Sequence, residues 1–184
     1  PVVVGAQIVT ALQTIASRAT SPVDSVVVSV TQFHAGDTWN VIPDQAVLRG
    51  TTRSSRPEIQ DATEGAIGRI ARQTAAAFGA TAELRYERRY PPTINTERET
   101  EIAAAAIAEV VGAENVRRDL PPTMGSEDFA FMLQAKPGAY VFIGNGADEQ
   151  ASPLHNPRYD FNDEVLALGA SYWARLVERT LARL

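Results

Sequence analysis

Apolar residues recur at helical spacing near the start of the chain and again in its middle. Residues 1–18 place Ile8 and Leu12 on one face of a predicted amphipathic helix, with polar residues on the other face. Residues 59–78 repeat this pattern, and Gly79 is placed to end the second helix in a left-handed conformation. The pattern therefore predicts two helices that each bury one face.

Three stretches of the first half have the pattern of β-strands. Residues 26–31 are a β-branched run, residues 46–53 alternate between two faces, and residues 82–87 alternate apolar with charged side chains. The order helix, strand, strand, helix, strand is that of a βαββαβ sandwich without its opening strand. Because the chain also begins without Met, we expect it to be a piece of a longer protein.

The second half of the chain begins after Pro91 and Pro92, which interrupt the strand pattern. We place a domain boundary there, between residues 1–92 and 93–184. The first predicted element after it is a helix that Thr96 and Glu99 cap and Gly112 ends. A short helix at 127–133 and a buried strand at 139–143 follow. The last element is a helix from Asn162 to Leu184 with two apolar stripes, so we expect other elements to pack on more than one of its sides.

Composition and charge exclude several classes of function. The 184 residues carry a formal charge of −5, which does not supply the basic field that nucleic acids require. The sequence has no Cys, so it forms no disulfide, zinc finger or thiol nucleophile. No segment approaches the ~20 apolar residues that cross a bilayer, and no targeting signal is visible. We expect a cytoplasmic protein without nucleic-acid or membrane partners.

Several polar residues in the predicted loops are candidates for chemistry. His155 lies in a loop that two prolines stiffen, which suits a metal ligand because coordination bonds are directional. A surface or turn histidine explains the same position. Gly125 and Ser126 precede a helix whose free N–H groups suit an oxyanion, although a plain helix cap explains them too.

The long connection between the first two strands is a further candidate. It contains Asn40, and loops of this length often reach a ligand, but Trp39 and neighbouring apolar residues are also consistent with a purely structural loop. Arg53, at the end of the next strand, has the alternative of an ordinary solvated or ion-paired residue. No Gly-rich phosphate loop and no Gly-x-Ser-x-Gly elbow occurs.

Four motifs, taken in order, resemble the M20 metallopeptidase family over essentially the whole chain. They are Asn-Val-Ile-Pro-Asp at 40–44, Arg-Gly-Thr-Thr-Arg at 49–53, Pro-Pro-Thr-Met-Gly-Ser-Glu-Asp-Phe at 121–129 and Leu-His-Asn-Pro-Arg-Tyr-Asp-Phe-Asn-Asp at 154–163. Within that family the chain is most similar to the amidohydrolases that cleave hippurate, N-acyl amino acids and indole-acetyl amino acids.

The resemblance implies an α/β fold of two parts. Residues 1–92 would be a ferredoxin-like α+β lid domain that lacks its first strand and pairs in a homodimer. Residues 93–184 would be the C-terminal α/β portion of a zinc-peptidase-like catalytic domain. The N-terminal half of that domain would supply the general base, a Glu, and most ligands of two divalent metal ions (Zn, Mn, Co or Ni).

The resemblance also implies roles for individual residues. His155 would be the last metal ligand, and Asn40 the lid residue that holds the scissile carbonyl or its oxyanion, often in the partner's active site. Arg53 would grip the substrate carboxylate. Gly125 and Ser126 would line the pocket, and Glu127 would orient neighbouring groups. A lid histidine of the family has no counterpart here, and His34 receives no role.

The implied reaction is amide hydrolysis of a hippurate-like N-acyl amino acid to an amino acid and a carboxylic acid, in which two metals activate a water molecule. The chain alone is expected to be inactive, since one histidine does not hold two metals. Three alternatives stay open: a non-catalytic module for dimerisation or substrate gripping, an M20 dipeptidase, and a deacetylase of N-acetyl-diaminopimelate.

Overall fold

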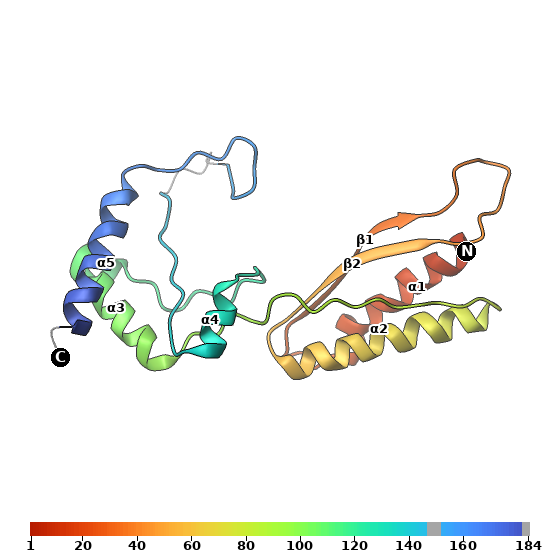
Figure 1. Ribbon diagram of the computed structural model, residues 1–184, viewed down its shortest axis with the longest axis horizontal. Helices are drawn as coiled ribbons and strands as arrows, with labels where there is room; N and C mark the ends of the chain where they lie inside the picture. Colours follow the sequence, from red (N-terminus) through yellow and green to blue (C-terminus); the bar gives the residue numbers. More distant parts are fainter. Residues whose placement is uncertain (147–151, 182–184) are drawn as a thin grey trace. The chain divides into compact units, whose positions relative to one another are not determined.

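The computed structural model describes residues 1–146 and 152–181, and these divide into two compact units. The first unit comprises Pro1–Pro92 and Met124–Glu127, and the second comprises Thr93–Thr123 and Asp128–Leu184. Leu184, which the sequence placed on the last helix, lies outside the described residues. Figure 1 shows the path of the chain through both units, and each unit is described by itself below.

The first unit packs two helices on a two-stranded antiparallel sheet. Strand β1 (Val26–His34) pairs with β2 (Val47–Ser54), and helices α1 (Val2–Thr14) and α2 (Pro57–Ala77) lie side by side along them (Figure 1). Helix α1 continues in a π-helical turn, Ile15–Ala19. The buried core consists of Ile8, Leu12, Ile15, Ile70 and Ala75. These helices and strands confirm the pattern expected from the sequence.

Two glycines serve the backbone of this unit. Gly79 follows the C-cap of α2, Phe78, and has a φ of 68°. The N–H of Ala80 bonds to the carbonyl of Ala75, so the predicted left-handed helix end is confirmed. Gly50 pairs with Val30 beside a β-bulge in β1. A Cβ at Gly50 would lie 2.1 Å from the carbonyl oxygen of Ser29, so only glycine fits there.

The register of the sheet decides which side chains of β2 meet the helices. Val28 pairs with Thr52, and both Val28 and Leu48 pack against the helical core. Because side chains alternate along a strand, Leu48 and Thr52 share this face and Arg53 points to the opposite face. The sheet thereby directs Arg53 away from the helices.

The prediction of a strand at 82–87 is wrong, because this segment does not join a hydrogen-bonded sheet in the described chain. The segment is extended and its residues alternate between exposed and half-buried, as expected, but no backbone hydrogen bond joins it to a neighbour among the described residues. A strand needs a partner ladder as well as a suitable pattern. Side chains make the connection here, since the hydroxyls of Thr52 and Tyr86 lie 2.6 Å apart.

The second unit is built around a pair of helices. Helix α3 (Glu97–Val111) packs on α5 (Val165–Leu181), with Ala103, Ala106 and Tyr172 buried between them. A 3₁₀ turn (Ala113–Asn115) follows α3, and α4 (Phe129–Ala135) is the short helix that the sequence predicted near 127–133.

The ends of α3 also follow the sequence. Gly112, with a φ of 86°, ends the helix as predicted. At its start Thr96 donates a hydrogen bond of 2.5 Å to the Glu99 carboxylate and lowers the pKa of Glu99, while the Thr96 side chain caps no backbone N–H of the helix. The predicted residue pair is therefore joined, but by a bond between side chains.

Two other expectations for this unit are wrong. Residues 139–143 form no strand, and Val141, Phe142 and Ile143 are 41%, 65% and 44% exposed, since no described strand lies beside them. On α5 the stripe that contains Tyr172 packs on α3, whereas the stripe that contains Trp173 is open, with Trp173 62% exposed. Among the described residues, only one of the two predicted stripes is covered.

The expectation that no segment is apolar and long enough to cross a membrane also needs correction. Residues Val2–Ala19 reach a mean hydropathy of 1.3 over 18 residues, which meets the criteria of length and composition. This is weak evidence, because core helices and signal sequences meet the same criteria. In this structure α1 packs Ile8 and Leu12 into the core.

Burial raises the pKa of the Tyr172 hydroxyl, and this predicts a pH dependence of stability. A tyrosine keeps its stabilising effect below its unfolded pKa of about 10 and loses it as the pH rises through the higher folded value. We expect the unfolding free energy of the second unit to fall above about pH 10 in the unsubstituted chain, and to fall less in Tyr172→Phe. Urea titrations followed by Trp173 fluorescence in a Trp39→Phe background measure this. An equal loss in both proteins contradicts the assignment.

Candidate functional site

Arg53 is held at the end of β2 by two neutral acceptors. Its Nη1 donates hydrogen bonds to the carbonyl oxygen of Met124 at 2.7 Å and to Oγ of Ser126 at 2.8 Å. Both acceptors come from a segment more than seventy residues later in the chain that packs in the same unit. The side chain is half-buried as a result.

The charge of Arg53 has no counter-ion among the residues that the structure describes. Arg179 is also half-buried, but it forms an ion pair with Glu109, and Arg56 pairs with Asp24 at 2.5 Å. Arg53 is therefore a fixed, partly desolvated cation whose nearest bonding partners are uncharged, an arrangement suited to an anionic ligand.

Gly125, Ser126 and Glu127 lie together in the segment that holds Arg53. Gly125 and Ser126 are exposed, and Glu127 is half-buried. Because α4 begins at Phe129, these residues form the approach to a helix, as predicted. The helix has seven residues, so we assign no anion site to its N-terminus. What the structure adds is the bond from Arg53 to Ser126.

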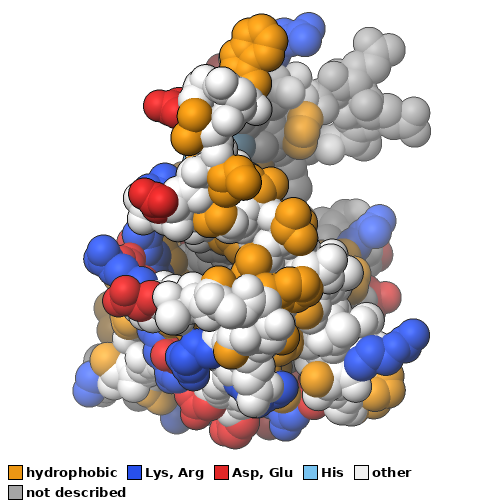
Figure 2. All heavy atoms as spheres, turned by 90° about the vertical axis from the view of Figure 1, so that its right-hand side faces the viewer, with side chains coloured by type: hydrophobic (Ala, Val, Ile, Leu, Met, Phe, Trp, Pro, Cys, Tyr) orange, Lys and Arg blue, Asp and Glu red, His pale blue; other side chains and the backbone are white. Residues whose placement is uncertain are grey.

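Asn40 lies in the exposed loop that joins β1 to β2. Its neighbours Trp39, Val41 and Ile42 are also exposed, with Trp39 fully so, which contradicts the structural alternative in which they pin the loop down. In Figure 2, which turns the right-hand side of Figure 1 toward the viewer, hydrophobic side chains are visible at the top of the picture, where this loop lies. The loop presents Asn40 beside apolar side chains.

The sheet places Asn40 and Arg53 at opposite ends of the hairpin. His34 pairs with Val47 where the loop begins, whereas Arg53 pairs with Val27 at the far end. At ~3.3 Å per residue, these two ends are about 20 Å apart. A small ligand that contacts Arg53 is therefore out of reach of Asn40 in the same copy of the chain.

His155 occupies the third position of a tight turn in the second unit. The N–H of Asn156 bonds to the carbonyl of Pro153 at 3.1 Å, and His155 has a φ of 68°. Positive φ at the third position is the mark of a type II turn, which usually has glycine there. His155 is the one non-glycine residue with positive φ in the described chain, and its imidazole is exposed. Unusual backbone conformations of this kind cluster at functional sites.

Asn145 fastens the loop that carries His155. Its amide nitrogen donates to the carbonyl of Asp160 at 3.2 Å, and its amide oxygen accepts from the N–H of Asn162 at 2.9 Å. Sequence reasoning assigned no role to Asn145, because nothing in the local sequence marks its bonds to backbone groups 15 and 17 residues away.

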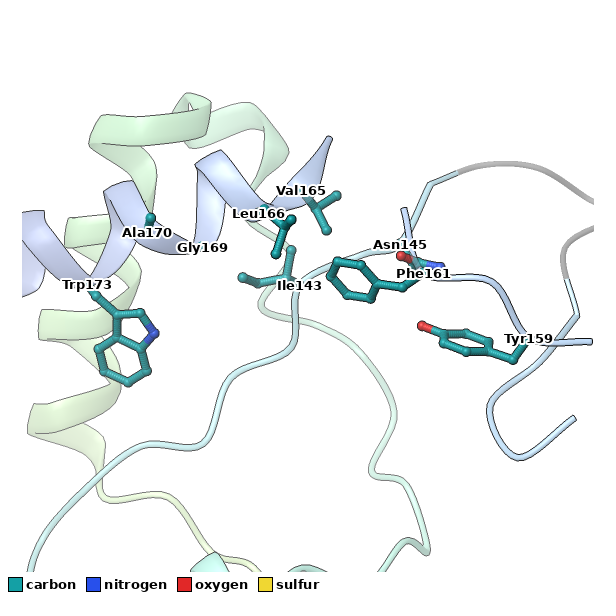
Figure 3. A pocket seen from close by; sticks show the side chains of 9 residues that line it. All are labelled: Ile143, Asn145, Tyr159, Phe161, Val165, Leu166, Gly169, Ala170 and Trp173. Carbon is teal, nitrogen blue, oxygen red and sulfur yellow. The ribbon is translucent and has the colours of Figure 1, made fainter. Parts of the chain in front are cut away.

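A shallow pocket of about 350 Å³ lies beside Asn145. Figure 3 shows Ile143, Phe161, Leu166 and Trp173 around it, together with Asn145 and the Tyr159 ring. Its lining is mainly apolar and contains no carboxylate or imidazole. The pocket therefore offers a mainly apolar surface, with the Tyr159 hydroxyl and the Asn145 amide among its few polar groups.

The described residues do not fit a metal centre by themselves. No group of three or more His, Asp or Glu side chains lies close enough within residues 1–146 and 152–181 to hold a metal ion. A carboxylate with a lowered pKa, such as Glu101, owes that shift to an arginine partner, here Arg118, and belongs to no such group. We therefore derive no metal-dependent step from this chain's own residues.

Comparisons with known proteins agree on one family. The model of peptidase family M20/M25/M40 matches residues 3–179. The chain is 35% identical over 181 residues to hippurate hydrolase of Campylobacter jejuni, covering 98% of this chain and 46% of the relative. It is 35% identical over 176 residues to N-acetylcysteine deacetylase of Bacillus subtilis, covering 96% and 45%.

A solved structure gives the same result. The crystal structure of a Bacillus subtilis protein, described as a dinuclear metal binding peptidase from the M20 family, matches with a TM-score of 0.80 at 31% identity. The match covers 100% of this chain and 46% of that one. The chain thus spans less than half the length of these relatives.

The contacts of Asn145 yield a prediction. Asn145→Ala removes both bonds that close the loop of His155, so we expect the amide hydrogen of Asn162 to exchange about 5- to 150-fold faster, from a net loss of about 1–3 kcal/mol. Hydrogen exchange followed by NMR measures this. Asn156→Ala is the control, since that side chain bonds only within its own turn, to the N–H of Arg158. Unchanged exchange at Asn162 in Asn145→Ala contradicts the assignment.

Proposed function

The chain belongs to the peptidase M20 family, and from that premise we propose that it contributes to a metal-dependent amidohydrolase that cleaves the amide bond of N-acyl amino acids. Hydrolase chemistry is common to the family. The preference for N-acyl amino acids is supported by two relatives that are named for such substrates, hippurate and N-acetylcysteine.

The observation that carries the proposal is Arg53. An N-acyl amino acid has one charged group, its α-carboxylate, and the planar guanidinium matches a carboxylate better than any other side chain. Arg53 is half-buried, fixed by neutral partners and without a counter-ion in the described parts of the chain. In the proposed reaction Arg53 binds the α-carboxylate and thereby orients the amide bond.

The two units receive the roles that the family implies. The first unit acts as the lid and dimerisation domain, supported by its two helices on one face of a sheet. The second contributes the C-terminal portion of the catalytic domain, with His155 as a metal ligand supported by its fixed, exposed turn. When bound, the two metals of the family would lower the pKa of a water molecule. The remaining ligands and the general base come from outside this sequence.

A homodimer gives Asn40 a function. Because Asn40 lies in the loop at one end of the hairpin and Arg53 lies at the other end, about 20 Å away along β2, Asn40 serves the active site of a partner subunit, where its amide holds the carbonyl oxygen under attack. The outer edge of β1 is unpaired in the described chain, and the exposed residues Gln7 and Thr10 of α1 are uncharged. We assign the dimer contact to this edge and this helix.

The dimer is tested by sedimentation. We expect the chain to dimerise at micromolar concentration and Gln7→Glu with Thr10→Glu to weaken the dimer at least tenfold, because four like charges then meet across a symmetric contact. Glu58→Gln and Glu97→Gln, exposed at the starts of other helices, serve as the matched control for a change of two charges. A chain that stays monomeric at ~100 μM contradicts the proposed dimer.

Ligand binding tests the role of Arg53. We expect Arg53→Gln to weaken hippurate binding at least tenfold, because a charge-assisted bidentate bond contributes about 1.5–3 kcal/mol. Arg56→Gln, three residues away and paired with Asp24, is the matched control. Isothermal titration with hippurate, glycylglycine and an N-acetylated diamine separates the amidohydrolase from a dipeptidase and from a deacetylase of diaminopimelate precursors. Equal hippurate affinity in both variants rules out the clamp.

Activity of the chain alone separates catalysis from gripping. With Zn²⁺, Mn²⁺ or Co²⁺ added, we expect no hydrolysis of hippurate by the 184 residues, because the described residues gather no metal-binding cluster. Release of glycine, measured by chromatography, would show that the chain holds a complete catalytic centre. Binding of hippurate with no activity from any longer form of the protein would favour the non-catalytic gripping module.

A further inference from the structure

The hydrogen bonds of Arg53 show which edge of its guanidinium has no bonding partner in the described chain. A guanidinium has five N–H donors, two of which are on Nη1. Nη1 donates to the carbonyl oxygen of Met124 at 2.7 Å and to Oγ of Ser126 at 2.8 Å, so both of its hydrogens are used. The Nε hydrogen and the two Nη2 hydrogens have no bonding partner in the described parts of the chain.

A carboxylate can meet a guanidinium in two bidentate geometries. It bonds either to Nη1 and Nη2 together or to Nε and Nη2 along the side. The first geometry is blocked here, since Nη1 is occupied by Met124 and Ser126. The second is open, and it places the carboxylate on the edge of the guanidinium away from the segment that anchors it.

We infer that Ser126 is a positioning residue, which together with the Met124 carbonyl anchors Arg53 through Nη1 so that its Nε–Nη2 edge binds a carboxylate. The inference rests on the proposed role of Arg53 as the carboxylate clamp and adds what orients that clamp. Anchoring removes rotamer freedom from a long side chain before the ligand arrives, so less entropy is lost on binding.

The chemistry of the two acceptors supports this division of roles. A carbonyl and a hydroxyl are neutral, so they fix the direction of the guanidinium without cancelling its charge. A carboxylate in either place would neutralise the guanidinium, as Asp24 does at Arg56 and Glu109 does at Arg179, and would compete with a carboxylate ligand. Glu127 follows Ser126 in the sequence and is half-buried, but it forms no ion pair with Arg53. The segment thus holds Arg53 while leaving its positive charge available.

The first experiment needs no ligand. NMR of the arginine Nε–Hε group reports the order of the Arg53 side chain, with Arg53→Gln identifying its signal. In the unsubstituted chain we expect an ordered Arg53 signal, with reduced order in Ser126→Ala and recovery in Ser126→Thr, which restores the hydroxyl. Ser55→Ala, an exposed serine next to β2, is the matched control. Unchanged order in Ser126→Ala overturns the inference.

The second experiment measures hippurate affinity by titration in the same variants. Loss of one anchoring bond predicts about two- to tenfold weaker binding in Ser126→Ala, with recovery in Ser126→Thr and no change in Ser55→Ala. Hippuramide, in which an amide replaces the carboxylate, should bind equally to all four proteins. The thermal midpoint should not follow this pattern, which separates positioning from general destabilisation.

The outcomes distinguish this inference from the proposed function. If Arg53→Gln weakens hippurate binding and Ser126→Ala does not, the clamp stands and the positioning role of Ser126 is wrong. If hippurate affinity is the same in Arg53→Gln and the unsubstituted chain, the proposed clamp is wrong, and with it the carboxylate-binding edge. The order of the Arg53 side chain then still decides whether Ser126 anchors it.

Discussion

The alternation of side chains along β2 is the constraint on which the candidate site depends. Thr52 faces the helices and Arg53 faces away from them, because consecutive residues of a strand point to opposite sides. The glycine at position 50 lets β1 approach closely enough to fix this register beside its bulge. A shift of one residue would exchange the two faces and bury the guanidinium against the apolar core.

Much of the fold was predictable because helix signals are local. The apolar stripe of α2 and the left-handed Gly79 that ends it lie within one short stretch of sequence, and so does Gly112 after α3. Strands depend on partners elsewhere in the chain. Residues 82–87 and 139–143 have the composition of strands, yet they form no ladder in the described chain because no backbone hydrogen bonds join them to a strand.

The same distinction applies to the site. The motifs identified Arg53 and Ser126 separately, through a family resemblance, but no periodicity relates two residues that are 73 positions apart and share a hydrogen bond. The positive φ of His155 was also beyond reach, since the sequence shows a histidine between prolines and no glycine to mark a turn. The sequence could therefore supply candidate residues, but it could not show which of their atoms meet.

The bond between Thr52 and Tyr86 has a consequence for how residues 82–88 respond to solvent. Hydroxyl contact and half-buried side chains hold this segment in place, while its main-chain amides bond to nothing in the described structure. Backbone amides and side chains of this segment should therefore differ in how well they are protected, the amides from deuterium exchange and the side chains from chemical labelling. Its amides take up deuterium as a loop does, whereas its inward side chains resist modifying reagents as a strand in a sheet does.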